Sequence, residues 1–217
     1  MWKLNERSYS MMDGLWGRKI GMTQVFAENR SVVPVTVIDT SHWMVTQIKT
    51  KENDGYAALQ VSNLRDRYCD KPFDLAWLKE LTKYFIETKE ILSKNDEIMS
   101  FEVGTSFDGL SLLQEGEALD IMGMTTGRGF QGCVKRHGFS GGKASHGDKV
   151  GRRPGSLSFM RSQGRVIKGK KLPGHMGVQQ RMMKNLKIVK VAPESHIVLV
   201  KGSVPGRTGS LVFMRKR

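Results

Sequence analysis

Hydrophobic and polar residues alternate along the first part of the chain in the way that β-strands require. In SVVPVTVID, residues 31–39, valine occupies every second position from 33 to 37, so one face of the segment is apolar. Residues 44–49 and 56–61 continue the pattern, and the pair Asp54–Gly55 between them is typical of a turn. The first sixty residues are therefore predicted to be strands.

A helical period follows between residues 73 and 92. The apolar residues of this segment fall near one face of a helix, with Lys or Glu on the other: Leu75, Leu78, Leu81, Phe85 and Leu92. Asp74 is suited to cap it. We predict a helix over 73–92, within an insertion at about residues 64–97 that packs against the strands.

Strand-like sequence returns at residues 98–103 and 118–122 and again, after a long interval, at 186–192, 196–202 and 210–214. Strands on both sides of the interval must close one sheet or barrel, so the fold class is mainly β. Residues 124–177 then form a long excursion from a compact body. An excursion of that length without a binding partner is uncommon, so we interpret it as functional.

The charge of the chain is concentrated in that excursion. The formal net charge is +14, yet residues 1–120 hold 14 basic and 19 acidic residues, whereas residues 121–217 hold 21 basic and 2 acidic. Between Ile121 and Lys171 there are twelve Lys or Arg and one acid, Asp148. Such a stretch buries too little apolar surface to fold alone, so it is predicted to become ordered on a large polyanion. A solvated linker is the alternative, disfavoured because the stretch is internal.

Several other classes of protein are disfavoured. Cys69 and Cys133 have no partner at metal-ligand spacing, which indicates a reducing compartment without a disulfide framework. No apolar run approaches the roughly 18 residues of a membrane helix. The first residues have neither a secretory core nor a clear transit character. A membrane or secreted protein is therefore not expected.

The glycines at 127, 129 and 132 spell the dinucleotide-binding pattern G-x-G-x-x-G. That site requires a helix after the glycines and a suitably placed acid for the ribose, and neither context is present. Glycine amides can instead approach a phosphate backbone closely, while Arg128, Lys135 and Arg136 supply charge. We predict the second use.

The histidines of the excursion are candidates for metal binding or acid–base chemistry. His137, His146 and His175 lack the spacing of a zinc site. A nuclease that uses His137 or His146 with Asp148 would lack paired carboxylates for a catalytic metal. Histidine among so many cations is better suited to stacking on bases or to hydrogen bonds with phosphates and sugars.

Aromatic residues lie among the cations at Phe130, Phe139 and Phe159. Two interpretations stay open, a local cluster that anchors the loop and stacking against unpaired bases, which contributes about 1–3 kcal/mol per base. Residues 152–171 are predicted to run out, turn around residues 162–164 and return, with Arg161 and Arg165 near the tip. A thin hairpin of this kind could enter folded RNA.

These observations predict an RNA-binding excursion with no catalytic or metal residues. The side chains predicted to contact RNA are Arg128, Lys135, Arg136, His137, Lys143, His146, Lys149, Arg152, Arg153, Phe159, Arg161, Gln163, Arg165, Lys168, Lys170, Lys171 and His175. The glycines predicted to allow close backbone approach to phosphate are Gly127, Gly129, Gly132, Gly141, Gly142 and Gly164.

The stretch from Leu113 to Arg136 resembles the signature of the large-subunit ribosomal protein L-three family, in its bacterial or organellar form. The matching positions are Leu113, Asp120, Gly123, Thr125, Gly127, Arg128, Gly129, Gly132 and Arg136. The blocks GLWGRKIGMTQVF, PVTVID, VTQIKTKENDGYAALQV, GRVIKGKKLPGHMG and VLVKGSVPGRTGS also match in order and spacing. The resemblance covers nearly the whole chain from Gly14 to about Phe213.

The resemblance implies a six-stranded β-barrel of the translation-protein type, a small α/β insertion and a long basic, glycine-rich extension. The expected division is an N-terminal extension at 1–13, a barrel body at 14–123 and 178–217, and an rRNA-binding arm at 124–177. Such a protein would be a non-enzymatic constituent of the large ribosomal subunit. It would nucleate early assembly near the 3′ domain of the rRNA and send its arm towards the peptidyl transferase centre.

The resemblance also implies partners and a location. Large-subunit rRNA and ribosomal proteins of the L-fourteen and L-nineteen families are the expected partners, with no membrane and no small-molecule substrate. No cofactor is expected, apart from structural Mg²⁺ held by the rRNA. A bacterial cytoplasmic ribosome is expected, with an organellar ribosome as the alternative.

This chain departs from the family at the tip of the arm. Arg161 stands where family members often have a glutamine, which some members methylate, and Gln163 is displaced by two residues. We therefore do not expect that modification. Two other functions are weighed against the structural role: a transient biogenesis or translation factor, disfavoured by the absence of a P-loop or spare domain, and an RNA-processing enzyme built on His137 and Asp148.

Overall fold

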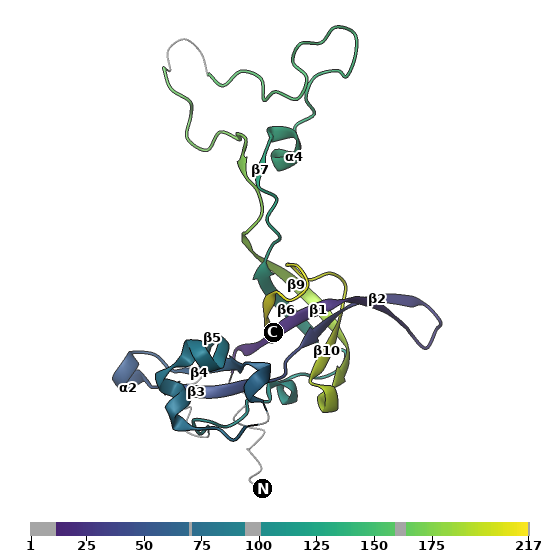
Figure 1. Cartoon of the computed structure of the whole chain (residues 1–217). Helices are drawn as coiled ribbons and strands as arrows, with labels where there is room; N and C mark the ends of the chain where they lie inside the picture. Colours follow the sequence, from purple (N-terminus) through teal and green to yellow (C-terminus); the bar gives the residue numbers. More distant parts are fainter. Residues whose placement is uncertain (1–11, 70, 94–100, 159–163, 217) are drawn as a thin grey trace. The chain divides into compact units, whose positions relative to one another are not determined.

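The computed structural model of the chain describes residues 12–69, 71–93, 101–158 and 164–216. The chain divides into two compact units. One unit is the continuous segment Thr125–Gln179, called the arm below, and the other comprises the residues before and after it, called the body. Figure 1 shows the strands of the body and the long course of the arm.

The body contains a closed antiparallel β-barrel with the strand order β1-β11-β6-β9-β10-β2, in which β2 pairs with β1 again. The six strands are β1 (Gly14–Phe26), β2 (Val32–Asp39), β6 (Ala118–Met124), β9 (Gln180–Ala192), β10 (Ile197–Lys201) and β11 (Leu211–Lys216). The predicted six-stranded barrel is therefore confirmed.

Apolar side chains two positions apart on three of the strands fill the barrel. The fully buried pairs are Leu119 and Ile121 in β6, Val198 and Val200 in β10, and Val212 and Met214 in β11. In a closed sheet the inward and outward positions alternate, so this spacing is what the barrel requires. Burial of each such side chain contributes about 1.5–3 kcal/mol.

Among the described residues of the body, one charged side chain, Lys19, is also buried. The Lys19 ammonium donates hydrogen bonds to the carbonyl oxygens of Val204, at 2.8 Å, and Gly206, at 3.0 Å. Both carbonyls belong to the loop that joins β10 to β11. Burying a charge is costly unless it is hydrogen-bonded, and these two bonds offset the cost while fixing the loop to β1.

A second sheet lies between β2 and β6 in the sequence. Its strands are β3 (Trp43–Lys49), β4 (Ala58–Leu64) and β5 (Phe85–Leu92), paired antiparallel in that order. The strands predicted at 44–49 and 56–61 therefore form, but in this sheet and not in the barrel. The turn predicted at Asp54–Gly55 is the end of the short helix α2 (Lys51–Asp54), with Gly55 at a φ of 82°.

The prediction of a continuous helix over 73–92 is wrong. The segment forms the 3-10 helix η2 (Leu75–Lys79), the single turn α3 (Leu81–Tyr84) and strand β5. Asp74 does cap η2, because its carboxylate accepts a hydrogen bond from the Ala76 amide at 2.9 Å. Beyond Tyr84 the backbone pairs with β4, and the side chains of Phe85 and Ile91 in this strand are buried. Strand pairing therefore overrides the helical spacing.

Short elements complete the body: η1 (Asp66–Tyr68), η3 (Gly109–Leu112) and η4 (Pro193–Ser195). At the start of the described chain, Met12 is buried and Asp13 forms an ion pair of 3.1 Å with Arg215.

None of the helices in the described residues combines the length and the apolar character of a membrane span.

Candidate nucleic-acid interface

The chain leaves the body along residues 125–131, the outgoing limb of the arm, and comes back along residues 174–179, the returning limb. The two limbs run antiparallel. Thr125 and Gln179 exchange hydrogen bonds through the Thr125 hydroxyl, and the Thr125 amide donates to the Gln179 carbonyl at 2.9 Å. Farther along, β7 (Phe130–Gln131) pairs with β8 (Gly174–His175). The backbone groups of both limbs are thus paired with each other, which leaves their side chains available to a partner.

The returning limb has an unusual backbone just before it ends. Gly177 has a φ of 83°, and a side chain there would lie 2.2 Å from the Thr126 carbonyl. The next residue, Val178, has a φ of 48°, which is strained for a β-branched residue. A side chain at Gly127 would meet the Val178 methyl at 2.8 Å. Packing between the limbs therefore accounts for Gly127, whether or not a phosphate approaches it.

A helical turn, α4 (Cys133–His137), follows the outgoing limb and is hydrogen-bonded to Leu172, just before the returning limb begins. The Arg136 guanidinium donates to the Leu172 carbonyl at 2.7 Å, and the His137 ring nitrogen lies 3.0 Å from the same oxygen. The Cys133 thiol donates weakly to the Lys171 carbonyl at 3.7 Å. The structure thus brings Arg136 and His137 together around a protein carbonyl, a role that the sequence did not signal.

The one acidic residue of the arm has a local structural role. Asp148 accepts a hydrogen bond from the Val150 amide at 2.9 Å, and its carboxylate occupies the space where a side chain of Gly142 would lie. The Gly142 amide donates to the Gly151 carbonyl at 2.7 Å and closes the loop. These contacts give Asp148 and Gly142 a structural explanation.

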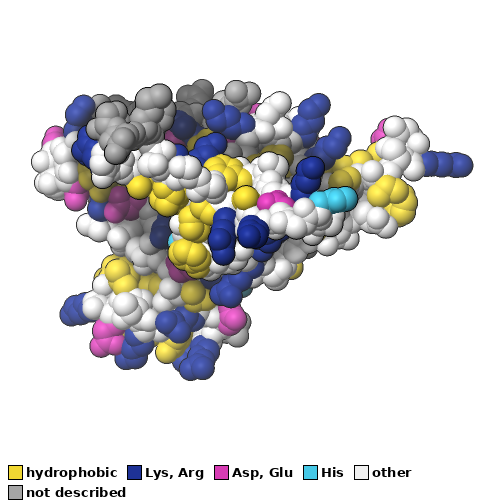
Figure 2. Space-filling view, turned by 90° about the horizontal axis from the view of Figure 1, so that it is seen from above, with side chains coloured by type: hydrophobic (Ala, Val, Ile, Leu, Met, Phe, Trp, Pro, Cys, Tyr) yellow, Lys and Arg dark blue, Asp and Glu magenta, His cyan; other side chains and the backbone are white. Residues whose placement is uncertain are grey.

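Almost all of the predicted RNA-binding side chains that the structure describes are exposed. They are Arg128, Lys135, Lys143, His146, Lys149, Arg152, Arg153, Arg165, Lys168, Lys170, Lys171 and His175, while Arg136 and His137 are half-buried. The predicted residues Phe159, Arg161 and Gln163 lie outside the described residues. Within the described part of the arm, no Lys or Arg forms an ion pair with a carboxylate. The described part of the arm therefore presents unneutralised positive charge. Figure 2 shows exposed Lys and Arg side chains scattered over the face that it displays.

The predicted phosphate-approach glycines fall into two groups. A side chain at Gly127, Gly141 or Gly142 would meet protein atoms within 3 Å, whereas Gly129, Gly132 and Gly164 have open space at that position. Only the second group is free of a packing explanation. The described residues contain no cluster of three or more His, Cys, Asp or Glu that could hold a metal ion.

The aromatic residues also differ from each other. Phe130 is 75 % exposed, whereas Phe139 is half-buried with its ring centroid 6.1 Å from that of His137. Of the two interpretations that the sequence left open, a local cluster describes Phe139 and His137. Phe130 contacts solvent.

A closed barrel that carries an arm of unneutralised cations defines a class of protein: structural components of ribonucleoprotein particles. Comparison with known proteins agrees. A family model described as Ribosomal protein L3 matches residues 86–196. The large ribosomal subunit protein uL3 of Geobacillus sp. (strain WCH70) is 44 % identical over 209 residues, which cover 94 % of this chain and 96 % of that protein.

Two further relatives are similarly close. The uL3 proteins of Syntrophus aciditrophicus (strain SB) and Dechloromonas aromatica (strain RCB) are each 42 % identical, over 92 % and 93 % of this chain and 91 % and 96 % of their own lengths. The chain belongs to the uL3 family of large ribosomal subunit proteins, as the resemblance predicted. This family is structural and non-enzymatic, which confirms the prediction that the chain is not an enzyme.

Proposed function

We propose that the protein is a structural constituent of the large ribosomal subunit and binds its rRNA chiefly through the arm. The observation that carries the proposal is the charge of the arm, with twelve Lys or Arg against Asp148 alone. Within the described part of the arm no Lys or Arg forms an ion pair with a carboxylate, so a single acid faces an excess of exposed cations. They are free to replace the counterions of crowded phosphates.

The arm binds by charge and shape rather than by reading a duplex sequence. Apart from Arg128, the described cations of the arm lie outside the short paired segment, on α4 and along loops without strand pairing, and single-stranded or irregular RNA accepts such an irregular surface better than a regular helix does. Gly129, Gly132 and Gly164 leave room for phosphates beside the backbone. No cofactor is required, and any structural Mg²⁺ is held by the rRNA.

We also propose a place for the protein in the particle. We assign it to early assembly near the 3′ domain of the rRNA, with the arm directed towards the peptidyl transferase centre, in a bacterial cytoplasmic ribosome like those of its bacterial relatives. The body then faces neighbouring proteins of the L-fourteen and L-nineteen families. Exposed apolar side chains on β1 and β2 support such protein contacts: Ile20, Met22, Phe26 and Val32.

Salt-dependent binding of the full chain to large-subunit rRNA tests this function. The logarithm of the affinity falls linearly with the logarithm of the salt concentration, by about 0.7–0.9 for each phosphate contact. Replacing Lys168, Lys170 and Lys171 together by Met should reduce the slope by roughly two to three. The matched control replaces three exposed cations of the body, Lys187, Lys190 and Lys201, and should change it less.

Equal changes in the two triple variants would contradict the assignment of RNA binding to the arm.

Retention on the particle distinguishes an integral constituent from a visiting factor. The protein should co-sediment stoichiometrically with large subunits through a high-salt gradient, and loss from the particle would favour the visiting factor.

A further inference from the structure

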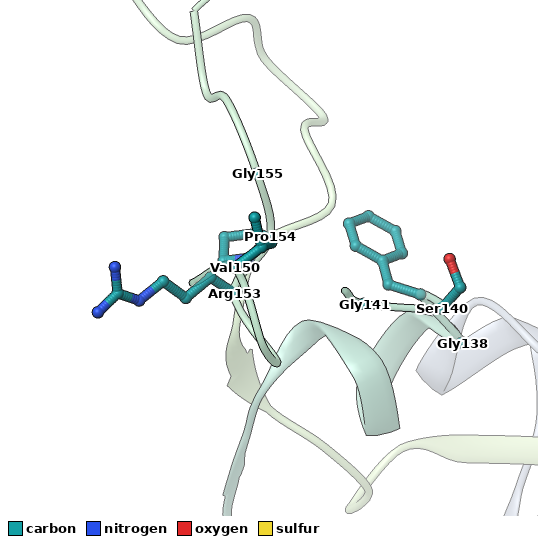
Figure 3. Close-up of a pocket in the computed structure, with 8 residues that line it drawn as sticks. Gly138, Ser140, Gly141, Val150, Arg153, Pro154 and Gly155 are labelled. Carbon is teal, nitrogen blue, oxygen red and sulfur yellow. The ribbon is translucent and has the colours of Figure 1, made fainter. Parts of the chain in front are cut away.

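The arm folds around a hollow between residues 138–141, which follow α4, and residues 150–155. The hollow has a volume of about 490 Å³ and is lined by residues that include Phe139, Gly141, Val150, Arg153, Pro154 and Gly155. Figure 3 shows Gly138, Ser140 and Gly141 on one side and Val150, Pro154 and Gly155 on the other. Its volume lies within the range of pockets that accommodate small organic groups, about 300–1,000 Å³.

Backbone hydrogen bonds define the walls of this hollow. Gly138 ends α4 in the left-handed conformation, with its amide bonded to the Val134 carbonyl at 3.0 Å, so the chain turns sharply before Phe139. The amide of Gly142 bonds to Gly151 at 2.7 Å and joins the two walls at their base. The Arg153 amide donates to the Val150 carbonyl at 3.1 Å and turns the second wall towards Pro154. The opening is thus built from residues that belong to one closed loop.

The chemistry of the lining suits a flat aromatic group. Phe139, Val150 and Pro154 provide apolar surface, and the glycines between them expose backbone amides and carbonyls that can hydrogen-bond the edge of a ring. No carboxylate lines the hollow. The Arg153 guanidinium points away from it in Figure 3, so its charge lies outside, where the phosphate of an inserted nucleotide would be.

We infer that this hollow binds an unpaired RNA nucleobase, stacked on Phe139, with Arg153 contacting the adjoining phosphate. The inference rests on the proposed function, since it requires that the arm binds RNA. The charge of the arm favours a nucleotide over an apolar side chain of a neighbouring protein, because Arg153 and the other Lys and Arg residues of the arm attract phosphate. A nucleobase is accessible to such a site only where the RNA is single-stranded or its base is extruded.

The test compares binding of the full chain to a short labelled single-stranded RNA and to a duplex of the same length. Stacking on an aromatic ring depends on its π-face, which leucine lacks although it keeps the apolar volume. Phe139→Leu should therefore weaken binding of the single strand about five-fold or more and leave duplex binding unchanged. Phe139→Trp should retain binding of both, and a thiouridine-containing single strand should cross-link to residues 138–155 of the unsubstituted chain.

Three outcomes decide the matter. Selective loss of single-strand binding in Phe139→Leu, restored in Phe139→Trp, supports the base-binding hollow. Equal binding by Phe139→Leu and the unsubstituted chain overturns it while leaving the proposed function intact. If the unsubstituted chain binds neither RNA, the proposed function fails and the inference fails with it.

Discussion

The Arg136 guanidinium and the Leu172 carbonyl, 36 positions apart in the sequence, are joined by a hydrogen bond of 2.7 Å. Arg136 thereby links the two limbs of the arm. A charge-assisted hydrogen bond contributes about 1.5–3 kcal/mol. Arg136→Met should therefore raise the local opening rate of the returning limb roughly tenfold or more, measured by hydrogen exchange at the Met176 amide, which bonds to Gly129 across the limbs.

The control for this variant is Arg128→Met, which removes an exposed cation from the outgoing limb. It should leave the exchange of Met176 unchanged. Identical exchange in both variants would show that Arg136 does not hold the limbs together, and its role would then be limited to RNA.

Lys19 should be important for the stability of the body. Lys19→Met keeps most of the side-chain volume but leaves the Val204 and Gly206 carbonyls without their donor. Unsatisfied buried polar groups cost about 1–3 kcal/mol, so the free energy of unfolding should fall by about that amount in urea titrations. Lys201→Met, at an exposed position of β10, should have little effect. A stability equal to that of the unsubstituted chain would mean that the loop carbonyls find water instead.

Acid should weaken the three-stranded sheet of β3, β4 and β5 through Glu90. The hydrogen bond from the Lys49 ammonium, at 2.7 Å, lowers the pKa of Glu90, assisted by a second bond from Tyr56 and opposed by partial burial. The pKa of Glu90 is lower in the folded state than the ordinary glutamate value of 4.5. The ionised carboxylate therefore stabilises the fold fully at pH values above 4.5, and this stabilisation is lost as the pH falls through the folded-state pKa.

The measurement is the difference in melting temperature between the unsubstituted chain and Glu90→Gln across pH. The unsubstituted chain should be slightly more stable near neutrality, and the difference should shrink in acid. The effect is small because the pair is partly exposed to solvent. Glu87→Gln on the same strand serves as the control, and a difference that does not vary with pH would argue against the ion pair.

Two glycines of the arm should respond differently to alanine. Gly164→Ala has open space in the protein, so any loss of rRNA affinity reports a phosphate close to the backbone, and a loss of about tenfold is expected. Gly142→Ala would displace the Asp148 carboxylate and should alter the free protein itself, seen as changed amide chemical shifts at Val150. Unchanged rRNA affinity in Gly164→Ala would remove that residue from the interface.

The alternation of valines from 33 to 37 was enough to predict a strand at β2, but not its buried face, because Thr36 and Ile38 are fully buried whereas Val33 and Val37 are half-buried. The pattern does not say which strand a segment joins, so residues 44–49 and 56–61 were predicted as strands without their separate sheet. The error at 73–92 has a similar origin. Leu75, Leu81 and Phe85 have helical spacing, yet the ladder from Ala58 to Leu64 supplies pairing partners that the local pattern cannot reveal.

The charge of the arm is a property of composition and was therefore predictable. Its internal contacts were not, because the bonds from Arg136 and His137 to Leu172 join residues far apart in the sequence. Similarly, Phe139 and Pro154 are too distant along the chain for their spacing to indicate a shared hollow. Lys19 resembles any surface lysine until the loop at Val204 is placed beside it.

The arm begins and ends beside a single residue pair of the barrel, because Met124 of β6 lies directly opposite Gln180 of β9. From the point of view of the barrel, the 55 residues from Thr125 to Gln179 replace a hairpin turn. The entropic cost of closing such a loop grows only with the logarithm of its length. Evolution can therefore lengthen, shorten or rewrite this segment with little penalty to the fold that carries it, and two residues such as Asn-Gly should be able to close the barrel in its place.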